Sequence, residues 1–169
     1  LVGAADIAVM TAEHGTAIHY ATSPGRQAPA DILVCDTQGL AVAAVAADCV
    51  PVVLDCGTEV VVVHAGWRGV LAGAVALAAH GRAVSNAVIG PSICGQCYEV
   101  SEQLIADFQR VQPAAVVAPR HLDLAAAARE QLPDVTVHHD VRCTREDPGL
   151  YSYRGGDQHQ RGGIVAVLA

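Results

Sequence analysis

The sequence predicts an α+β fold, a layered domain with mixed β-sheets flanked by helices. Short and nearly continuous runs of Val, Ala, Leu and Ile are typical of buried strands. Other segments place apolar residues at helical spacing. Hairpin-like connections outnumber strand–helix–strand crossovers, which favours mixed sheets over a purely parallel one.

The expected strands share an apolar run that ends at Gly, Pro or polar turn residues. In chain order they cover residues 16–22, 31–35, 40–46, 50–55, 60–63, 84–89, 115–118, 135–139 and 164–168. Residues 1–10 are weakly apolar and fit either a strand or a helix. Residues 23–30 contain two Pro and one Gly, so we expect a loop there.

Three helices are expected from the spacing of their apolar residues, at 69–80, 100–111 and 123–132. Asp123 is an expected N-cap of the third, because its carboxylate can accept from the free N–H groups of the first turn. Residues 143–162 are rich in Gly, Arg and Asp, which predicts a polar loop.

Composition narrows the function classes. The 169 residues suit one domain, which we place at 1–169, and 52% are apolar with only 4% aromatic. The net charge is −7, and all ten basic residues are Arg without a basic run, so nucleic-acid binding is not expected. No apolar run is long enough to predict a membrane span. The six Cys are expected to be free thiols in a reducing compartment.

The stretch 47–69 carries the first candidate chemistry. Two buried strands, 50–55 and 60–63, are joined by a short turn, with Cys49 at the start of the first and His64 at the end of the second. Each has two interpretations: Cys49 is a small buried hydrophobe or a reactive thiol, and His64 makes a structural hydrogen bond or binds a metal. His14, in a polar turn, is a surface histidine or a functional one.

Cys94 and Cys97 form a CxxC pair, which alone permits redox or metal chemistry. No second CxxC is present, so a closed site of four cysteines is not expected. A mixed site that combines His64 with one of these cysteines remains open, and it would leave a free position for catalysis.

An ordered series of motifs resembles the YfiH family. It runs from Glu-His-Gly at 13–15 and Asp-Ile-Leu-Val at 31–34 through Ala-Asp-Cys-Val-Pro at 47–51 and His-Ala-Gly-Trp-Arg-Gly at 64–69. It continues with Ile-Gly-Pro-Ser-Ile at 89–93, Cys-Tyr-Glu-Val at 97–100, Leu-Asp-Leu at 122–124, Arg-Cys-Thr at 142–144 and Tyr-Ser-Tyr-Arg at 151–154. The resemblance covers nearly the whole chain. The family carries a further N-terminal stretch before the His-Gly turn, and we expect this sequence to lack it.

The resemblance implies a zinc-dependent purine nucleoside phosphorylase. Members are described as acting on adenosine, inosine and methylthioadenosine, as deaminating adenosine, and as cytoplasmic. The implied partners are small molecules, a nucleoside and phosphate, and the implied cofactor is Zn²⁺ or, from older descriptions, Cu²⁺. His64 matches one zinc ligand and Cys97 a second; His121, or else the position of Gln112, is the third.

The resemblance also implies catalytic pocket residues. Cys49 and His14 match pocket positions, and Asp48 is a further candidate for moving protons. Arg68 and Arg161 are candidates for holding phosphate. Three rivals remain: a copper-dependent polyphenol oxidase of laccase type, a cysteine hydrolase with Cys49 as nucleophile, and a degenerate relative without enzyme activity.

Overall fold

The structure, a computed structural model, describes residues 6–168. Its strands are β1 (Ile7–Thr11), β2 (Ile18–Tyr20), β3 (Gly25–Pro29), β4 (Ile32–Cys35), β5 (Ala41–Ala46), β6 (Val50–Asp55), β7 (Val60–Ala65), β8 (Asn86–Ile89), β9 (Val116–Ala118), β10 (His121–Leu122), β11 (Thr136–His139) and β12 (Gly162–Val167). Its α-helices are α1 (Trp67–Leu71), α2 (Ala74–Ala79), α3 (Glu102–Val111) and α4 (Leu124–Glu130).

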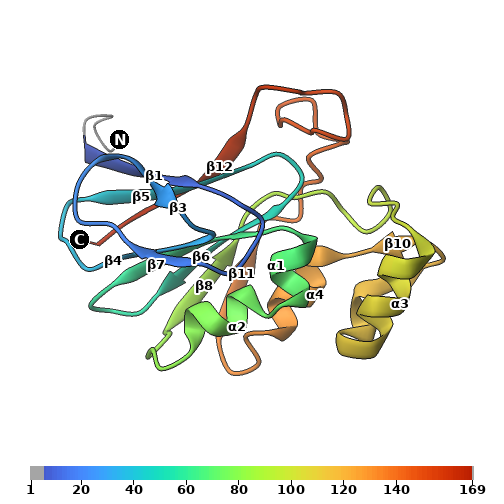
Figure 1. Cartoon of the computed structure of the whole chain (residues 1–169), viewed down its shortest axis with the longest axis horizontal. Helices are drawn as coiled ribbons and strands as arrows, with labels where there is room; N and C mark the ends of the chain where they lie inside the picture. The colour runs from blue at the N-terminus through green and yellow to red at the C-terminus, as the bar shows by residue number, and fades with distance from the viewer. Residues whose placement is uncertain (1–5, 169) are drawn as a thin grey trace.

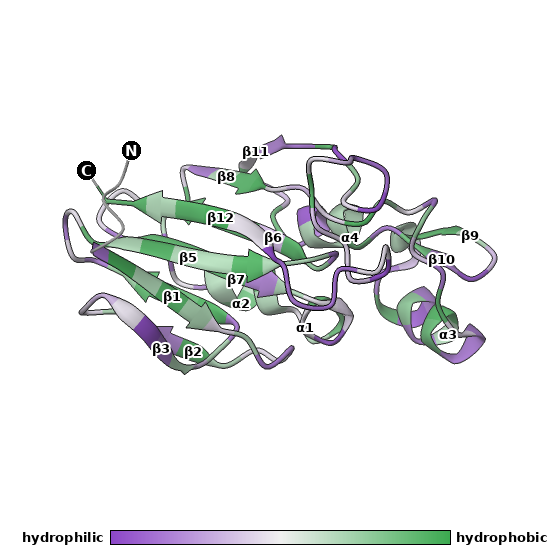
Figure 2. Ribbon diagram, turned by 90° about the horizontal axis from the view of Figure 1, so that it is seen from above, coloured by the Kyte–Doolittle hydropathy of each residue, from purple (hydrophilic) through white to green (hydrophobic). Residues whose placement is uncertain are grey.

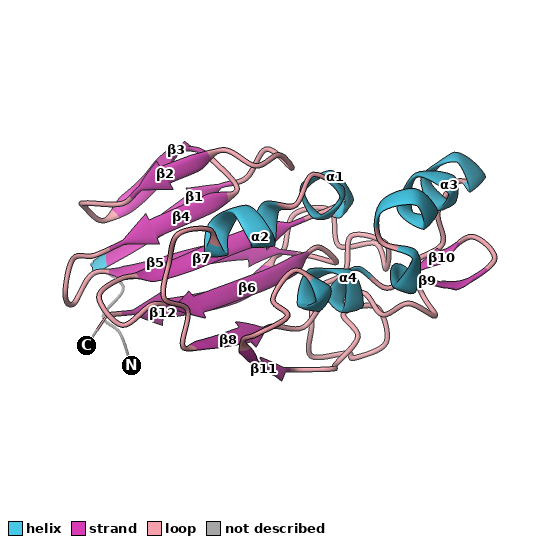
Figure 3. Cartoon of the chain, turned by 90° about the horizontal axis from the view of Figure 1, so that it is seen from below, coloured by secondary structure: helices cyan, strands magenta, loops and turns pink. Residues whose placement is uncertain are grey.

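Two mixed sheets are stacked and helices cover one of them (Figure 1). The larger sheet has six strands in the order β11-β8-β6-β7-β4-β2, and the smaller has four in the order β12-β5-β1-β3. Helices α1, α2 and α4 lie on the outer face of the six-stranded sheet, while α3 lies at one end beside β9 and β10 (Figure 3). The fold class expected from the sequence is confirmed.

The central strands are buried on both faces, which explains their unbroken apolar sequence. In β4, Ile32 and Val34 belong to the core beneath the helices, whereas Leu33 and Cys35 belong to the core between the two sheets. At the sheet edge, β3 carries mostly hydrophilic residues (Figure 2). Burying each such aliphatic side chain contributes about 1.5–3 kcal/mol, so the middle of the six-stranded sheet is a rigid base for the residues at its strand ends.

Two elements differ most from the sequence prediction, and the two-residue strand β10 was not expected either. The helix expected at 69–80 is two short helices, because Gly73 has a φ of 78° and interrupts the backbone between them. The loop expected at 23–30 contains β3, an edge strand parallel to β1; an edge position tolerates Pro because one side of the strand needs no ladder hydrogen bond. Within residues 6–168, no helix has the length and apolar character to cross a membrane.

The β6–β7 hairpin positions Cys49 and His64. Its antiparallel register pairs Val50 with Ala65 and Pro51 with His64. Cys49, immediately before β6, therefore lies at the same end of the hairpin as the end of β7 and the turn into α1. The neighbouring strand-end positions of Cys49 and His64 follow directly from this pairing.

Candidate functional site

A cavity of about 530 Å³ opens where β6 begins and β7 ends. Its walls come from both sheets, from the start of α1 and from the long loop before β12. The lining residues with polar or aromatic side chains include His14, Arg26, Asp48, Cys49, His64, Trp67, Arg68, Tyr98, Tyr153, Arg154 and Arg161. Such a mixture of apolar walls and a few converging polar groups is typical of small-molecule sites.

Three possible metal ligands converge on one side of the cavity. His14, Cys49 and His64 each place one nitrogen or sulfur within 4.8 Å of the other two. The two imidazole rings meet edge to face, with their centroids 4.8 Å apart. His64 is buried, Cys49 half-buried and His14 exposed, so the group is open to the cavity from one side.

Asp31 orients this group from behind. Its fully buried carboxylate accepts from His64 Nδ1 at 2.9 Å, which leaves the other ring nitrogen directed to Cys49. The same carboxylate accepts from the backbone N–H groups of Glu13, His14 and Gly15, at 3.2, 2.9 and 2.7 Å. A carboxylate behind a histidine is the usual support for a metal-binding imidazole. Asp31 therefore fixes both histidines, one through its ring and one through its backbone.

The protonation of the group follows from these contacts. Burial raises the pKa of Cys49, but hydrogen bonds with His14 and His64 outweigh it and bring the pKa to about 7. Burial lowers the pKa of His64, and its bonds to Asp31 and Cys49 reverse this and raise the pKa to about 9. Burial also raises the pKa of Asp31, yet the bonds from His64, Gly15 and His14 leave it below its usual value. Between about pH 7 and pH 9, the metal-free group therefore favours a Cys49 thiolate beside a His64 imidazolium.

Glycine is required where the turn into α1 passes the group. A Cβ on Gly66 would lie 3.1 Å from His14 Cδ2 and 3.2 Å from Cys49 Sγ. A Cβ on Gly69 would lie 2.9 Å from the backbone oxygen of Gly15, which cannot move aside easily. These two glycines of the His-Ala-Gly-Trp-Arg-Gly motif allow the histidine turn to pack against the start of the helix.

Asp48 has a positioning role in this geometry. Its Oδ1 accepts from Thr144 Oγ1 and Ser152 Oγ, both at 2.7 Å, and its Oδ2 accepts from the backbone N–H of Arg154 at 2.7 Å. Its φ of 90° is strained for a residue other than glycine. Asp48 thus holds the 143–157 loop over the cavity and fixes the backbone next to Cys49, while both its oxygens are already engaged.

Arginines and aromatic rings form the remaining walls. The Arg68 guanidinium lies 4.3 Å from the centroid of the Trp67 ring, and that of Arg154 lies 4.9 Å from the centroid of Tyr98. Arg26 and Arg161 complete a set of four cations on the cavity, in a chain with only ten. Planar guanidinium groups suit phosphate, and the rings offer flat apolar surfaces.

The structure does not bring together the expected ligands His64, Cys97 and His121. Cys97 lies in a different group of side chains, and the His121 ring donates to the backbone oxygen of Pro119 at 2.9 Å. Gln112, the other candidate, is buried and donates to the oxygen of Ala127. The cause is strand pairing: the β6–β7 register makes Cys49, not Cys97, the cysteine beside His64.

Asp31 is the functional residue that sequence reasoning missed. An Asp that directly precedes a fully apolar strand was visible in the sequence, and its complete burial is what such a position requires. Its partners lie sixteen or more residues away, so the sequence alone did not indicate what it binds. Tyr98, which also lines the cavity, stood out in the sequence only as part of the Cys-Tyr-Glu-Val motif, whereas Arg154 is one of the few cations that we expect to be able to hold phosphate or a carboxylate.

Comparison with known proteins agrees with the fold. The chain superimposes on the crystal structure of the hypothetical protein YfiH of Bacillus licheniformis with a TM-score of 0.80 at 22% identity, covering 98% of this chain and 75% of that one. It is 34% identical over 172 residues to a purine nucleoside phosphorylase of Streptomyces coelicolor, covering 90% of this chain and 71% of the relative. It is 35% identical over 150 residues to the adenosine deaminase RL5 of an unknown prokaryote, covering 73% of this chain and 56% of the relative.

A family model decides the classification, since it matches residues 2–169, almost the full sequence. The two relatives found by sequence carry the names of enzymes that act on purine nucleosides, whereas the family model carries the description of a copper oxidase. The chain belongs to the family described as multi-copper polyphenol oxidoreductase laccase, the YfiH family.

Proposed function

We propose that this protein is a metal-dependent purine nucleoside phosphorylase of the cytoplasm that acts on adenosine, inosine and methylthioadenosine and also deaminates adenosine. The observation that carries the proposal is the convergence of His14, Cys49 and His64 on a cavity that also presents four arginines and three aromatic rings. The names of the relatives support the substrate class.

The donor set fits a metal of borderline softness. Two imidazoles and one thiolate are the ligand types that Zn²⁺ and Cu²⁺ prefer, and three protein ligands are typical of catalytic zinc sites with one open position. A metal bound there supplies a Lewis acid and lowers the pKa of water. We assign it to His14, Cys49 and His64, which replaces the set of His64, Cys97 and His121 expected from the sequence.

The chain's own residues have separate tasks in phosphorolysis. Asp31 holds the His64 ring and the 13–15 turn in place, so the ligand group needs little rearrangement. Arg68, with the other arginines of the cavity, binds inorganic phosphate. Trp67 and Tyr98 offer surfaces on which a purine can stack. Aligning the two substrates in one cavity supplies much of the rate enhancement.

Phosphorolysis exchanges one bond of the ribose C1′ for another. A phosphate oxygen forms a bond to C1′ of the ribose while the bond from C1′ to N9 of the purine breaks. The electron pair of that bond leaves with the base, which takes up the proton that the attacking hydrogen phosphate gives up. The arginines offset the charge of the phosphate throughout. The products are the free purine and ribose 1-phosphate, and phosphate is consumed. Deamination instead consumes water and releases ammonia.

A copper oxidase is the second candidate, because two His and one Cys are also the core of a blue-copper site and the family description names copper. Laccase chemistry, however, uses several coppers held by many histidines. In the described part of the chain, only His14 and His64 among the histidines join a possible metal group. The four arginines of the cavity have no evident use in phenol oxidation.

The test is product analysis with the purified protein loaded with zinc or copper. We expect adenine and ribose 1-phosphate from adenosine only when phosphate is present, and a slower, phosphate-independent release of ammonia. His64→Ala should abolish both reactions, whereas the matched control His80→Ala, at an exposed helix end, should retain them. Oxygen uptake with a phenol and copper, without nucleoside cleavage under either metal, would overturn the proposal.

A further inference from the structure

A second group of metal-binding side chains lies outside the cavity. Cys94, Cys97, Cys143 and Glu146 place their sulfur and carboxylate atoms within 4.8 Å of one another. The first two come from the loop between β8 and α3, and the other two from the loop between β11 and β12. We propose that these four side chains bind a structural zinc ion that joins the two loops.

The spacing of the four residues is that of paired metal-binding turns. Cys94 and Cys97 are three residues apart, and so are Cys143 and Glu146. Structural zinc sites commonly take two ligands from each of two such turns. A search for a second CxxC misses this pattern, because the last donor is a carboxylate. Zinc accepts carboxylate oxygen together with thiolates, so the set of four is chemically complete.

The same backbone turn is formed in both pairs. The N–H groups of Cys97 and Tyr98 donate to the Cys94 oxygen, each at 3.0 Å. The N–H groups of Glu146 and Asp147 donate to the Cys143 oxygen at 3.2 and 2.9 Å. Such a turn folds the chain back within four residues, so the two donors of each pair lie on one side of it.

Backbone N–H groups surround the sulfur of Cys143. The backbone N–H of Cys94 donates to Cys143 Sγ at 3.3 Å, and the N–H groups of Arg145 and Glu146 also bond to this sulfur. The Arg145 guanidinium donates to the backbone oxygen of Cys97 at 3.3 Å, which brings a positive charge next to the group. N–H groups directed at a sulfur stabilise the thiolate form that binds metal, and here they act on Cys143.

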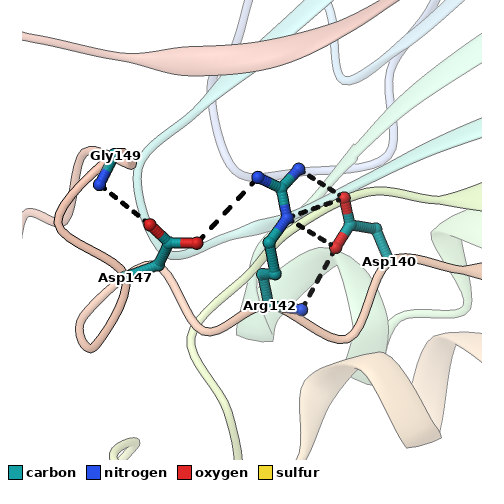
Figure 4. A network of polar contacts seen from close by, with 4 residues as sticks. All are labelled: Asp140, Arg142, Asp147 and Gly149. Carbon is teal, nitrogen blue, oxygen red and sulfur yellow. Dashed lines mark hydrogen bonds and ion pairs between the residues drawn. The ribbon is translucent and has the colours of Figure 1, made fainter.

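The second loop is held in shape without a metal (Figure 4). The Asp140 carboxylate accepts from the backbone N–H of Arg142 and from its guanidinium, which also lies 3.9 Å from Asp147. Asp147 in turn accepts from the N–H of Gly149 at 2.8 Å. These contacts flank Cys143 on one side and Glu146 on the other, so the ligands are presented by a braced loop.

The distances leave little to rearrange. Ligands about 2.0–2.3 Å from a tetrahedral zinc are separated by about 3.3–3.8 Å, so donors already within 4.8 Å need only small side-chain rotations. Cys143 is buried, Cys94 and Cys97 are half-buried and Glu146 is exposed, which gives the ion a path from solvent.

A zinc ion there would stabilise one wall of the cavity. Tyr98 lines the cavity and directly follows Cys97, and Thr144, which holds Asp48, directly follows Cys143. Linking the two loops through a metal therefore fixes the Tyr98 ring relative to the loop that carries Arg154. This role is structural and independent of whether the cavity itself binds a metal.

The test counts metal ions in protein purified under reducing conditions with zinc supplied. We expect Cys143→Ser to bind one zinc ion per chain fewer than the wild type, and His64→Ala to keep the zinc that Cys143→Ser loses. Glu146→Gln, an exposed change that spares folding, should weaken zinc retention against a chelator by more than about tenfold, and Glu146→Cys should restore it. The control Cys56→Ser, a cysteine outside both groups, should match the wild type.

Cobalt substitution gives a readout separate from activity. In His64→Ala we expect the sulfur-to-cobalt charge-transfer band of a site with three thiolates, and we expect Cys143→Ser to weaken it. Equal zinc content in the wild type, Cys143→Ser and Glu146→Gln would overturn the proposal. The proposal would also be overturned if Cys94 and Cys97 formed a disulfide and, after that disulfide was reduced, the protein took up no metal at this position.

Discussion

Replacing Asp31 with Asn tests how much the group of His14, Cys49 and His64 depends on its support. The two carboxylate oxygens of Asp31 accept from the His64 ring and from the backbone of the 13–15 turn. An Asn has one oxygen and one NH₂, so in either orientation at least one N–H donor faces the NH₂. A buried donor then loses its partner, and the charge that favours the His64 hydrogen bond disappears.

The magnitude follows from burial. Asp31 is fully buried and His64 nearly so, and breaking a buried pair of this kind costs about 3–5 kcal/mol. For a chain of this size that corresponds to a fall in melting temperature of about 6–20 °C. Changing the support behind a metal-binding histidine lowers metal affinity by about 10–100-fold, and we expect Asp31→Asn to fall in this range.

The assay is calorimetric melting together with metal titration, each compared with Asp36→Asn. Asp36 is five residues away and exposed, so its substitution changes the same charge without touching the site. A variant Asp31→Asn that binds metal and melts as the wild type does would refute the assigned role of Asp31.

Three further outcomes are expected. Asp48→Asn, which disturbs three bonds of 2.7 Å, should destabilise the protein by about 2–4 kcal/mol in calorimetry; an unchanged melting temperature would contradict the positioning role. In metal-free protein, the alkylation rate of Cys49, followed by peptide mass spectrometry, should have its midpoint at about pH 7, because the pKa of the thiol is lowered from 9.0 and the thiolate persists to lower pH. His14→Ala removes one of the hydrogen bonds that lower this pKa and should move the midpoint upward. Arg68→Ala should raise the KM for phosphate by more than about tenfold with a smaller change for nucleoside, and equal changes in both would speak against a phosphate contact.

Patterns within single strands predicted much of the fold. Continuous apolar runs located β4 to β7, and these strands are buried on both faces as such runs require. Asp123 accepts from the Ala126 N–H, as expected of an N-cap. The edge strand β3 was missed because its pairing with β1 depends on residues distant in the sequence. The break at Gly73 was missed although a glycine just past a helix end is a local stop signal.

The candidate site shows where local patterns stop being informative. The pattern of two apolar runs joined by a short turn predicted Cys49 and His64 at neighbouring strand ends, and the β6–β7 register agrees with this prediction. The match to family motifs instead paired His64 with Cys97 as metal ligands. The structure places Cys97 in another group of side chains. The partnership of Asp31 with His64 spans 33 residues, and that of Cys94 with Cys143 spans 49. Contacts of this range arise from sheet topology and loop packing, which residue spacing does not encode.

The most direct test of the central claim is the anomalous scattering map of a crystal of the metal-loaded, active protein. We predict a peak about 2.0–2.3 Å from Cys49 Sγ, from a ring nitrogen of His64 and from a ring nitrogen of His14. A peak that joins His64 to Cys97, or no peak at Cys49 in protein that still cleaves adenosine, would contradict the account.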